Sequence, residues 1–193
     1  MSVSTSVSAS SEPQYTVPGM SLAQGSDVAA ILQQRLHALN DLALTLKHVH
    51  WNVTGPHFIA VHEMLDPQVD AVRVMVDDVA ERIATLGASP IGTPGALVAG
   101  RRWEDYSLGR ADTMAHLGAL DSVYDGVISD HRNAMTRTEQ PDPVTQDLLI
   151  AQLGELEKFQ WFIRAHLENQ DGSVRTAGAM SERSAADLAG ARR

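Results

Sequence analysis

Residues 61–87 read VHEMLDPQVDAVRVMVDDVAERIATLG, and their large apolar side chains recur at intervals of three, four or seven positions. This spacing places them on one face of an α-helix, the face expected to be buried. Gly87 follows the last of them and suits the left-handed position that often ends a helix. The segment therefore predicts one long amphipathic helix, with an apolar face formed by Val61, Leu65, Val72, Val76, Val79, Ile83 and Leu86.

Three further segments repeat the helical spacing of apolar residues. They cover residues 26 to 51, about 110 to 136, and 142 to 171. Ser26 and Asp142 are residue types that cap the N-terminus of a helix, and Asp142 precedes a proline, which is favoured at the first helical position. With the segment quoted above, the chain has four predicted long helices.

The stretch between the second and third predicted helices has a different composition. Residues 87–100 read GASPIGTPGALVAG, which is too rich in glycine and proline to continue a helix. It predicts a long connection with at most one short turn of structure. No stretch of the chain alternates with the period of a β-strand. Four long helices with one long central connection predict an all-α four-helix bundle.

The two ends of the chain contain few large apolar residues. Six of the first eleven residues are serine, and residues 169–193 are mostly small, polar or charged. Such segments bury too little surface to offset the entropy that is lost when a chain becomes ordered. We expect a flexible arm over residues 1–20, one helical domain over 21–168, and a flexible tail over 169–193 with a short helix near 182–191.

The composition limits the classes of function. The chain of 193 residues has no cysteine, so any metal must be held by imidazole and carboxylate groups. Its net charge of -9, from 24 acids against 15 bases, opposes a general electrostatic attraction to nucleic acid or anionic lipid. No apolar run has the length of a membrane span or a secretory signal. We therefore expect a cytoplasmic location and no membrane partner.

Acidic residues on the helix predicted for residues 61–87 suggest a cation site. At 100° per residue, His62, Asp66, Asp77 and Glu81 fall within an arc of ~100° beside the apolar face. Asp77 and Glu81 are like charges four positions apart, an arrangement that costs an isolated helix about 0.2–0.5 kcal/mol. The alternative is an ordinary surface face paired with arginine. That alternative suits Asp78, which has Arg82 four positions later.

His62 and Asp66 have the spacing that lets one helical face offer two ligands to one ion. An imidazole and a carboxylate suit divalent iron, manganese or zinc. Asp66 and Glu81, however, are separated by ~22 Å of helix axis, so one chain cannot close both pairs around one metal. Two antiparallel copies of the helix, related by a two-fold axis near its middle, would bring the two pairs together. The spacing thus predicts a metal site at a dimer interface.

Residues preceding this helix bear on the same site. His50 follows apolar positions at seven-residue steps and is expected on the inner side of the first helix, whereas His57 lies in the connecting loop and could assist. Trp51, beside His50, is a candidate packing anchor in the core or at an interface. Pro67 opposes the prediction, because a purely local rule would begin the helix at Asp66 and separate it from His62.

The motif HWNVTGPHFIAVHEMLD (residues 50–66), followed by Asp77 and AERIATLG (residues 80–87), resembles the Dps proteins, small ferritins named for DNA binding in starved cells. The resemblance covers roughly residues 27–168 and is closest to the mycobacterial and actinobacterial type. It implies a ferritin-like bundle that assembles into a hollow dodecamer of twelve subunits. It also implies iron as the bound metal and ferroxidase activity, with storage of ferric mineral and protection of DNA from oxidative damage. The implied intersubunit ligands are His50, His62 and Asp66 of one chain with Asp77 and Glu81 of its neighbour.

The resemblance implies less about DNA and about iron entry. DNA-binding members carry tails rich in lysine or arginine, but the arm here has no base before Arg35 and the tail has only four arginines. The sequence therefore predicts at most weak, salt-dependent DNA contacts, and leaves nucleoid association open. Asp142 and Asp147, near the start of the last helix, are candidates for lining an entry pore.

Three alternatives share these residues. A histidine and carboxylate site can activate a metal-bound water, so a metal-dependent hydrolase is one alternative. A DNA-binding nucleoid protein with an incidental metal site is another. The third is a helical bundle with no metal site.

Overall fold

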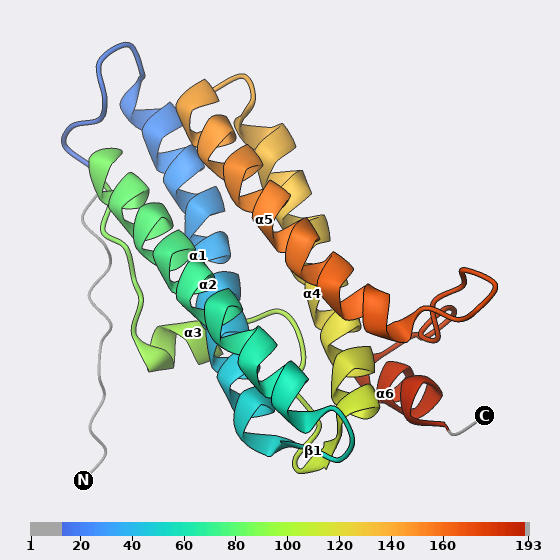
Figure 1. The fold of residues 1–193 in the computed structure, drawn as a ribbon. Helices are drawn as coiled ribbons and strands as arrows, with labels where there is room; N and C mark the ends of the chain where they lie inside the picture. Colours follow the sequence, from blue (N-terminus) through green and yellow to red (C-terminus); the bar gives the residue numbers. More distant parts are fainter. Residues whose placement is uncertain (1–12, 192–193) are drawn as a thin grey trace, which may run out of the picture.

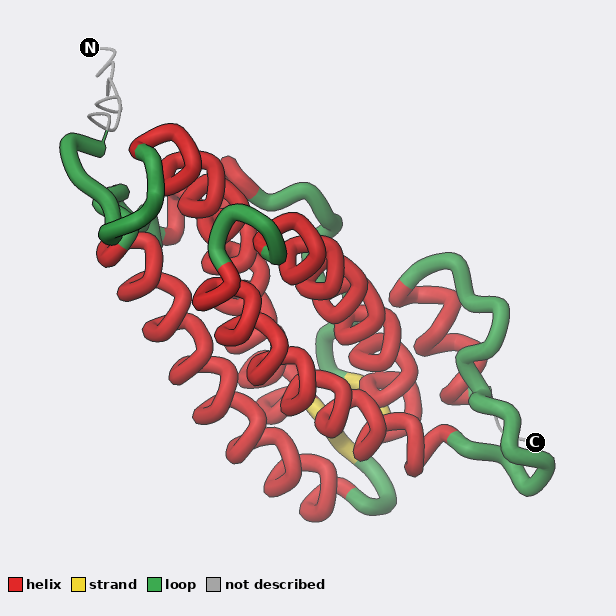
Figure 2. Tube along the Cα trace, turned by 90° about the horizontal axis from the view of Figure 1, so that it is seen from above, coloured by secondary structure: helices red, strands yellow, loops and turns green. Residues whose placement is uncertain are grey.

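The computed structural model describes residues 13–191. Four long helices form an elongated bundle: α1 (Leu22–Asn52), α2 (Phe58–Thr85), α4 (Thr113–Thr138) and α5 (Pro143–Leu167). Figure 1 shows α1 beside α2 and α4 beside α5, and Figure 2 shows the long helices running side by side in a second view. The predicted all-α, four-helix bundle is confirmed.

A short pair of strands fixes the direction of the second helical pair. β1 (Val53–Thr54) follows α1 directly and pairs in parallel with β2 (Ala111–Asp112), which precedes α4 directly. The pairing places the start of α4 beside the start of α2, so the connection must return along the whole bundle. This connection contains the short helix α3 (Pro94–Gly100) of 7 residues, which is longer than the single short turn predicted from the sequence. The strands themselves were not predicted, because two residues are too few to show a strand period.

The core lies along the facing sides of the four helices. Fully burying one leucine or valine contributes about 1.5–3 kcal/mol, so the repeated apolar positions supply the main driving force. A buried polar contact crosses this core, where the Tyr124 hydroxyl donates to the side-chain oxygen of Gln68 at 2.7 Å. The largest fully buried side chains besides Tyr124 are Leu32, Leu36, Leu39, Leu42, Leu46, Leu65, Ile83, Leu86, Leu117, Leu120 and Leu149.

Helix α1 begins at Leu22, four residues before the predicted cap, Ser26. Its N-cap is Ser21, whose hydroxyl accepts a hydrogen bond from the Gln24 backbone while the Gln24 side chain accepts from the Ser21 backbone. This reciprocal capping box satisfies two backbone donors at the helix end. The prediction of Ser26 as the cap was therefore wrong, because the Ser-x-x-Gln pattern upstream is the stronger signal.

Helix α2 continues through Pro67 without interruption. It begins at Phe58, after His57, which takes the left-handed conformation with φ of 66°. The local rule against proline is overridden because buried residues on both sides of it, Leu65 and Val69 among them, hold the helix against the core. His62 and Asp66 therefore lie on the same helix, as the metal-site prediction requires.

The predicted arm falls mostly on residues 1–12, outside the described residues. Residues 13–20 lie against the bundle: the Tyr15 carbonyl comes so close to Gly87 that a side chain at Gly87 would collide with it. Gly87 has φ of 88°, the left-handed conformation predicted for the end of α2. Among residues 13–191, no helix is both long and apolar enough to cross a membrane.

The C-terminal segment packs on the bundle through the predicted short helix, α6 (Glu182–Gly190). Its Ala185, Ala186 and Ala189 are buried, and the fit against α4 depends on Gly118. A Cβ atom at Gly118 would lie 2.5 Å from the Ala185 carbonyl oxygen. The flexibility expected for residues 169–193 stays a prediction. Within this segment, the structure shows that α6 is docked on the bundle.

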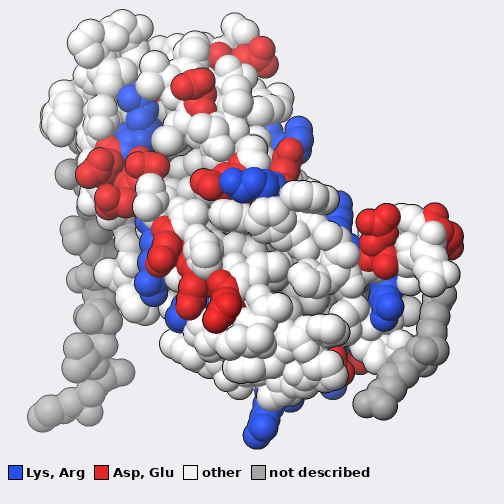
Figure 3. Space-filling model, in the orientation of Figure 1, with Lys and Arg blue, Asp and Glu red and all other residues white. Residues whose placement is uncertain are grey.

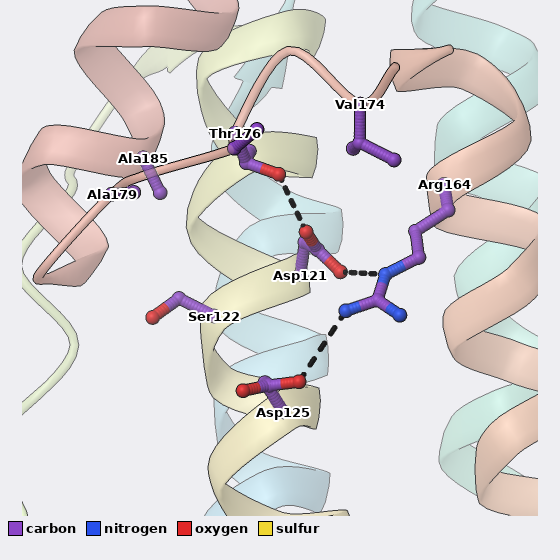
Figure 4. A pocket seen from close by; sticks show the side chains of 9 residues that line it. Asp121, Ser122, Asp125, Arg164, Val174, Thr176, Ala179 and Ala185 are labelled. Carbon is purple, nitrogen blue, oxygen red and sulfur yellow. Dashed lines mark hydrogen bonds and ion pairs between the residues drawn. The ribbon is translucent and has the colours of Figure 1, made fainter. Parts of the chain in front are cut away.

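A buried carboxylate also holds this segment. Asp121 of α4 accepts hydrogen bonds from the Thr176 hydroxyl at 2.7 Å and from Nε of Arg164 at 2.7 Å. Figure 4 shows these contacts beside a small cavity of about 220 Å³, with a second Arg164 nitrogen reaching Asp125. The polar atoms of Asp121 are thus used in joining the C-terminal segment to α4 and α5.

Candidate metal centre

Two histidines face each other across the turn between α1 and α2. The rings of His50 and His62 are stacked, with centroids 3.6 Å apart and an interplanar angle of 24°. The two residues are twelve positions apart in sequence and lie on different helices. The backbone conformation of the turn between the helices brings them together. His50 is buried, as predicted for the inner side of α1, and His62 is half-buried.

Reciprocal hydrogen bonds fix both rings. Nδ1 of His50 lies 3.0 Å from the His62 carbonyl oxygen, and Nδ1 of His62 lies 2.9 Å from the His50 carbonyl oxygen. A carbonyl oxygen can only accept, so both Nδ1 atoms must carry the proton. In the neutral rings the lone pair is then on Nε2 of each histidine. A ring nitrogen oriented in this way by a hydrogen bond on the other nitrogen is the usual metal-ligating arrangement.

Asp66 lies beside the histidine pair and contacts the His50 ring. Its Oδ1 lies 3.2 Å from Nδ1 of His50 and 2.8 Å from Nζ of Lys47. The hydrogen bond from Lys47 is the main cause that holds the pKa of Asp66 below its usual range, and the two histidines act in the same direction. The Asp66 carboxylate is half-exposed and therefore accessible to an ion from solvent.

Asp77 and Glu81 lie on the same helix but far from this group. Both are exposed on α2, and eleven and fifteen residues of continuous helix separate them from Asp66. At 1.5 Å per residue, the distance from Asp66 to Glu81 along the axis is ~22 Å. Over residues 13–191, the chain by itself forms no group of three or more histidine, aspartate or glutamate residues placed to hold a metal.

Two nearby residues were missed by the sequence prediction. Lys47 contacts Asp66, and its ammonium lies 5.8 Å from the centre of the Trp51 ring. Phe58, the first residue of α2, has its ring centroid 5.0 Å from that of His62. A signal for Lys47 exists in the sequence, because it precedes His50 by three positions and so shares its helix face. Trp51 is 70% exposed and is not a core residue of a single chain.

One predicted ion pair is wrong. Arg82 does not pair with Asp78; its guanidinium instead lies 2.7 Å from a carboxylate oxygen of Asp142, at the start of α5. The same carboxylate accepts a hydrogen bond from Thr145. Because Asp142 is only 4% exposed and already paired, it offers no free carboxylate for a pore, whereas Asp147 is exposed. A contact between α2 and α5 thus replaces one within α2.

The surface charge is uneven on the face that carries α2. Figure 3 shows acidic side chains gathered over the part of this face where α2 runs in Figure 1. The exposed acids of α2 include Asp70, Asp77, Asp78 and Glu81. Their combined field favours the approach of cations to this face.

The bundle with its single long crossing connection is the arrangement of a ferritin-like protein, and the chain matches the ferritin-like domain family over residues 29–172. It is 59% identical to the DNA protection during starvation protein of Mycolicibacterium smegmatis over 175 residues, covering 91% of this chain and 96% of that protein. The solved structure of Mycobacterium smegmatis Dps has a TM-score of 0.85 at 60% identity, covering 86% of this chain and 95% of that one. DpsA14 from Streptomyces coelicolor has a TM-score of 0.84 at 63% identity, covering 86% and 99% of the two chains. The chain belongs to the Dps family, the DNA protection during starvation proteins.

Proposed function

We propose that this protein oxidises Fe(II) at sites shared between two copies of the chain and stores the ferric product inside a hollow dodecamer. The observation that carries the proposal is the stacked pair His50 and His62, each with a proton fixed on Nδ1 and a lone pair on Nε2. With Asp66, one copy offers two nitrogen ligands and one carboxylate, a set suited to ferrous iron.

The other half of the site comes from the neighbouring copy. An antiparallel pair of α2 helices, crossing near its middle, brings Asp77 and Glu81 of one copy to His62 and Asp66 of the other. Each pair of copies then has two such sites. The exposure of Asp77 and Glu81 in the single chain supports this role, because neither carboxylate is used within the fold described here.

The chemistry follows from the ligand set. Iron is the substrate: two ferrous ions each give one electron to hydrogen peroxide, which takes up two protons and leaves as two water molecules. No hydroxyl radical is released, because both electrons reach the same peroxide. Carboxylates hold both oxidation states of iron, and the imidazoles of His50 and His62 retain affinity for the ferrous state. Trp51 stands beside His50 as a candidate for reducing stray oxidising species.

Protection of DNA would follow from removal of iron and peroxide in the cytoplasm. The described part of the tail carries Arg175 and Arg183, and Arg183 is exposed. With a net charge of -9 on each chain, direct DNA contacts are expected to be weak and lost at physiological salt. A gel-shift assay at two salt concentrations distinguishes such weak contacts from the salt-resistant binding expected of a DNA-binding nucleoid protein.

The test compares the parent protein with the double variant His62→Ala, Asp66→Ala. Each protein is loaded with Fe(II) without oxygen, peroxide is added, and the ferric absorbance is followed over time. We expect fast oxidation and a soluble product in the parent, and loss of the fast phase in the variant. The matched control is His166→Ala, Glu139→Ala, which removes an exposed histidine and an exposed acid away from the site.

The control variant should retain the fast phase. Oxidation in the parent no faster than in buffer would overturn the ferroxidase proposal and favour the hydrolase alternative. The assay for a hydrolase is the release of an amine or alcohol from a model amide or ester. Equal rates in the parent and the site variant would show that oxidation occurs elsewhere.

A further inference from the structure

A large cavity lies on the opposite side of α1 from α2 and has no part in the proposed iron site. It has a volume of about 580 Å³ and is enclosed by α1, α4, the segment around Trp103 and the start of α6. This volume is within the range of sites that hold small organic ligands, about 300–1,000 Å³. The cavity is therefore large enough for a ligand rather than for a few waters.

The walls combine apolar and aromatic side chains. Leu42 of α1 lines the cavity together with Val123 and Val127 of α4, and the rings of Trp103 and Tyr106 complete this part of the lining. The Trp103 ring is held in place because its Nε1 donates to a carboxylate oxygen of Asp41 at 2.6 Å. The ring lines the cavity, and aromatic π faces attract organic cations.

The Glu182 side chain lines the cavity, and within the described residues one of its carboxylate oxygens has no hydrogen-bond partner. This oxygen, Oε2, is buried. Burial raises the pKa of Glu182, and the nearby carboxylates of Asp41 and Asp105 raise it further, against a backbone hydrogen bond from Ser107. A buried carboxylate oxygen without a donor is costly, and a cation beside it would remove that cost.

The basic side chains around the cavity do not neutralise its acidic side chains. Arg101 pairs with Asp41 and Asp105, at 3.6 Å and 2.7 Å, and so is engaged away from Glu182. The acidic side chains that line the cavity are Asp41, Glu104, Asp105, Asp130 and Glu182. Among the described residues, one arginine, Arg183, lines the cavity, and two others, Arg35 and Arg101, pair with these acids. The lining therefore retains net negative charge beside an apolar wall.

We propose that this cavity binds a small organic ammonium ion with an apolar body, whose N–H groups donate to the Glu182 carboxylate while its body lies against Leu42, Val123 and Trp103. One carboxylate with an unpartnered oxygen, beside aromatic and aliphatic walls, matches an amine better than a metal ion, which requires several oxygen or nitrogen ligands. The site does not depend on the proposed iron chemistry.

The test uses 2-phenylethylamine, which is cationic at neutral pH, and the similarly shaped neutral 2-phenylethanol. Binding to the intact, assembled protein is measured by isothermal titration calorimetry and by ligand-observed NMR. We expect the amine to bind at least about tenfold more tightly than the alcohol, since a charge-assisted hydrogen bond contributes that much. Magnesium chloride at the same ionic strength as a sodium chloride control should not compete.

Three variants locate the binding site. Glu182→Gln keeps the shape and should weaken amine binding about tenfold or more. Gly126→Leu should abolish it by filling the cavity: Gly126 lines the cavity, and a Cβ there meets no heavy atom within 4 Å. Glu139→Gln removes an exposed acid outside the cavity and should leave binding unchanged.

Loss of binding in Gly126→Leu could not be attributed to a weakened helix, because leucine favours a helix more than glycine does. The proposal is overturned if the parent binds no amine at millimolar concentration, or if the alcohol binds as tightly as the amine. It is also overturned if magnesium displaces the amine, or if Glu182→Gln and Gly126→Leu both bind it like the parent.

Discussion

At the scale of single residues, His131 shows how burial controls a proton. It is completely buried, and its Nε2 donates to the side-chain oxygen of Gln152 at 3.0 Å. Burial lowers the pKa of His131 from 6.5 to about 4. The folded protein therefore keeps this ring neutral at pH values where the unfolded chain takes up a proton.

This difference predicts a loss of stability in acid. The neutral ring makes its full contribution above the unfolded pKa of 6.5, and the contribution is lost as the pH falls towards about 4. A shift of this size corresponds to about 3 kcal/mol in the free energy of unfolding. His131→Gln keeps a hydrogen-bond donor for Gln152 but cannot titrate. We expect its urea midpoint to fall less than that of the parent between pH 7 and pH 4.5, at equal protein concentration.

The exposed His166 supplies the control for this measurement. His166→Gln should show the same dependence on pH as the parent, because the side chain is not enclosed by the fold. If His131→Gln instead loses as much stability as the parent, another buried group is responsible for the acid sensitivity.

Single residues also show which contacts around the proposed site could be predicted from the sequence and which could not. His62 and Asp66 could be placed together because their spacing alone defines a shared helix face. The stacking of His50 on His62 was beyond the sequence, since it depends on the conformation of the turn and on the left-handed His57. The pairing of Arg82 with Asp142 was missed because its partner is 60 residues away.

At the scale of elements, the packing of α6 on α4 depends on two helices approaching closely at Gly118. Replacing an exposed helical glycine with alanine normally stabilises a protein by about 1 kcal/mol. At Gly118 the added Cβ would lie 2.6 Å from the Cβ of Ala189 and 2.5 Å from the Ala185 carbonyl oxygen, so α6 must move away. We therefore expect Gly118→Ala to lower thermal stability and to speed cleavage by trypsin at Arg175 and Arg183.

Gly126→Ala is the matched control, because it lies in the same helix and its added Cβ meets no neighbour. It should raise the melting temperature slightly and leave the rate of cleavage unchanged. Similar cleavage of the two variants would mean that α6 is not held by this contact.

The elements themselves were largely predictable, and the errors have physical reasons. The four long helices follow from the spacing of apolar residues, which burial in one core enforces. The start of α1 was misplaced because Ser26 has the right residue type, but only Ser21 has its partner Gln24. The local signal at Pro67 was overruled by tertiary packing along α2, which a short window of sequence does not contain.

At the scale of the whole molecule, the proposed site belongs to a pair of chains, and this can be tested by mixing variants. One variant carries His62→Ala, Asp66→Ala and the other Asp77→Ala, Glu81→Ala. Each alone should be inactive. When they are co-expressed in equal amounts and pair at random, about a quarter of the sites receive both intact halves. We expect the mixed protein to recover about a quarter of the fast ferroxidase phase.

The two homogeneous variants are the controls, and each should assemble as the parent does in size-exclusion chromatography. A mixed protein that is no more active than the average of the two would show that the site lies within one chain. Recovery close to that of the parent would also contradict random pairing.

The turn between α1 and α2 has a consequence for the order in which the chain folds. His50 and His62 are joined by a loop of twelve residues, whereas β1 and β2 join residues 58 positions apart. Closing a short loop loses less chain entropy, and contacts near in sequence form faster. The α1–α2 hairpin should therefore align its two imidazoles before the second helical pair docks, so that the nascent chain acquires its proposed nitrogen ligands while the rest of the bundle is still being made.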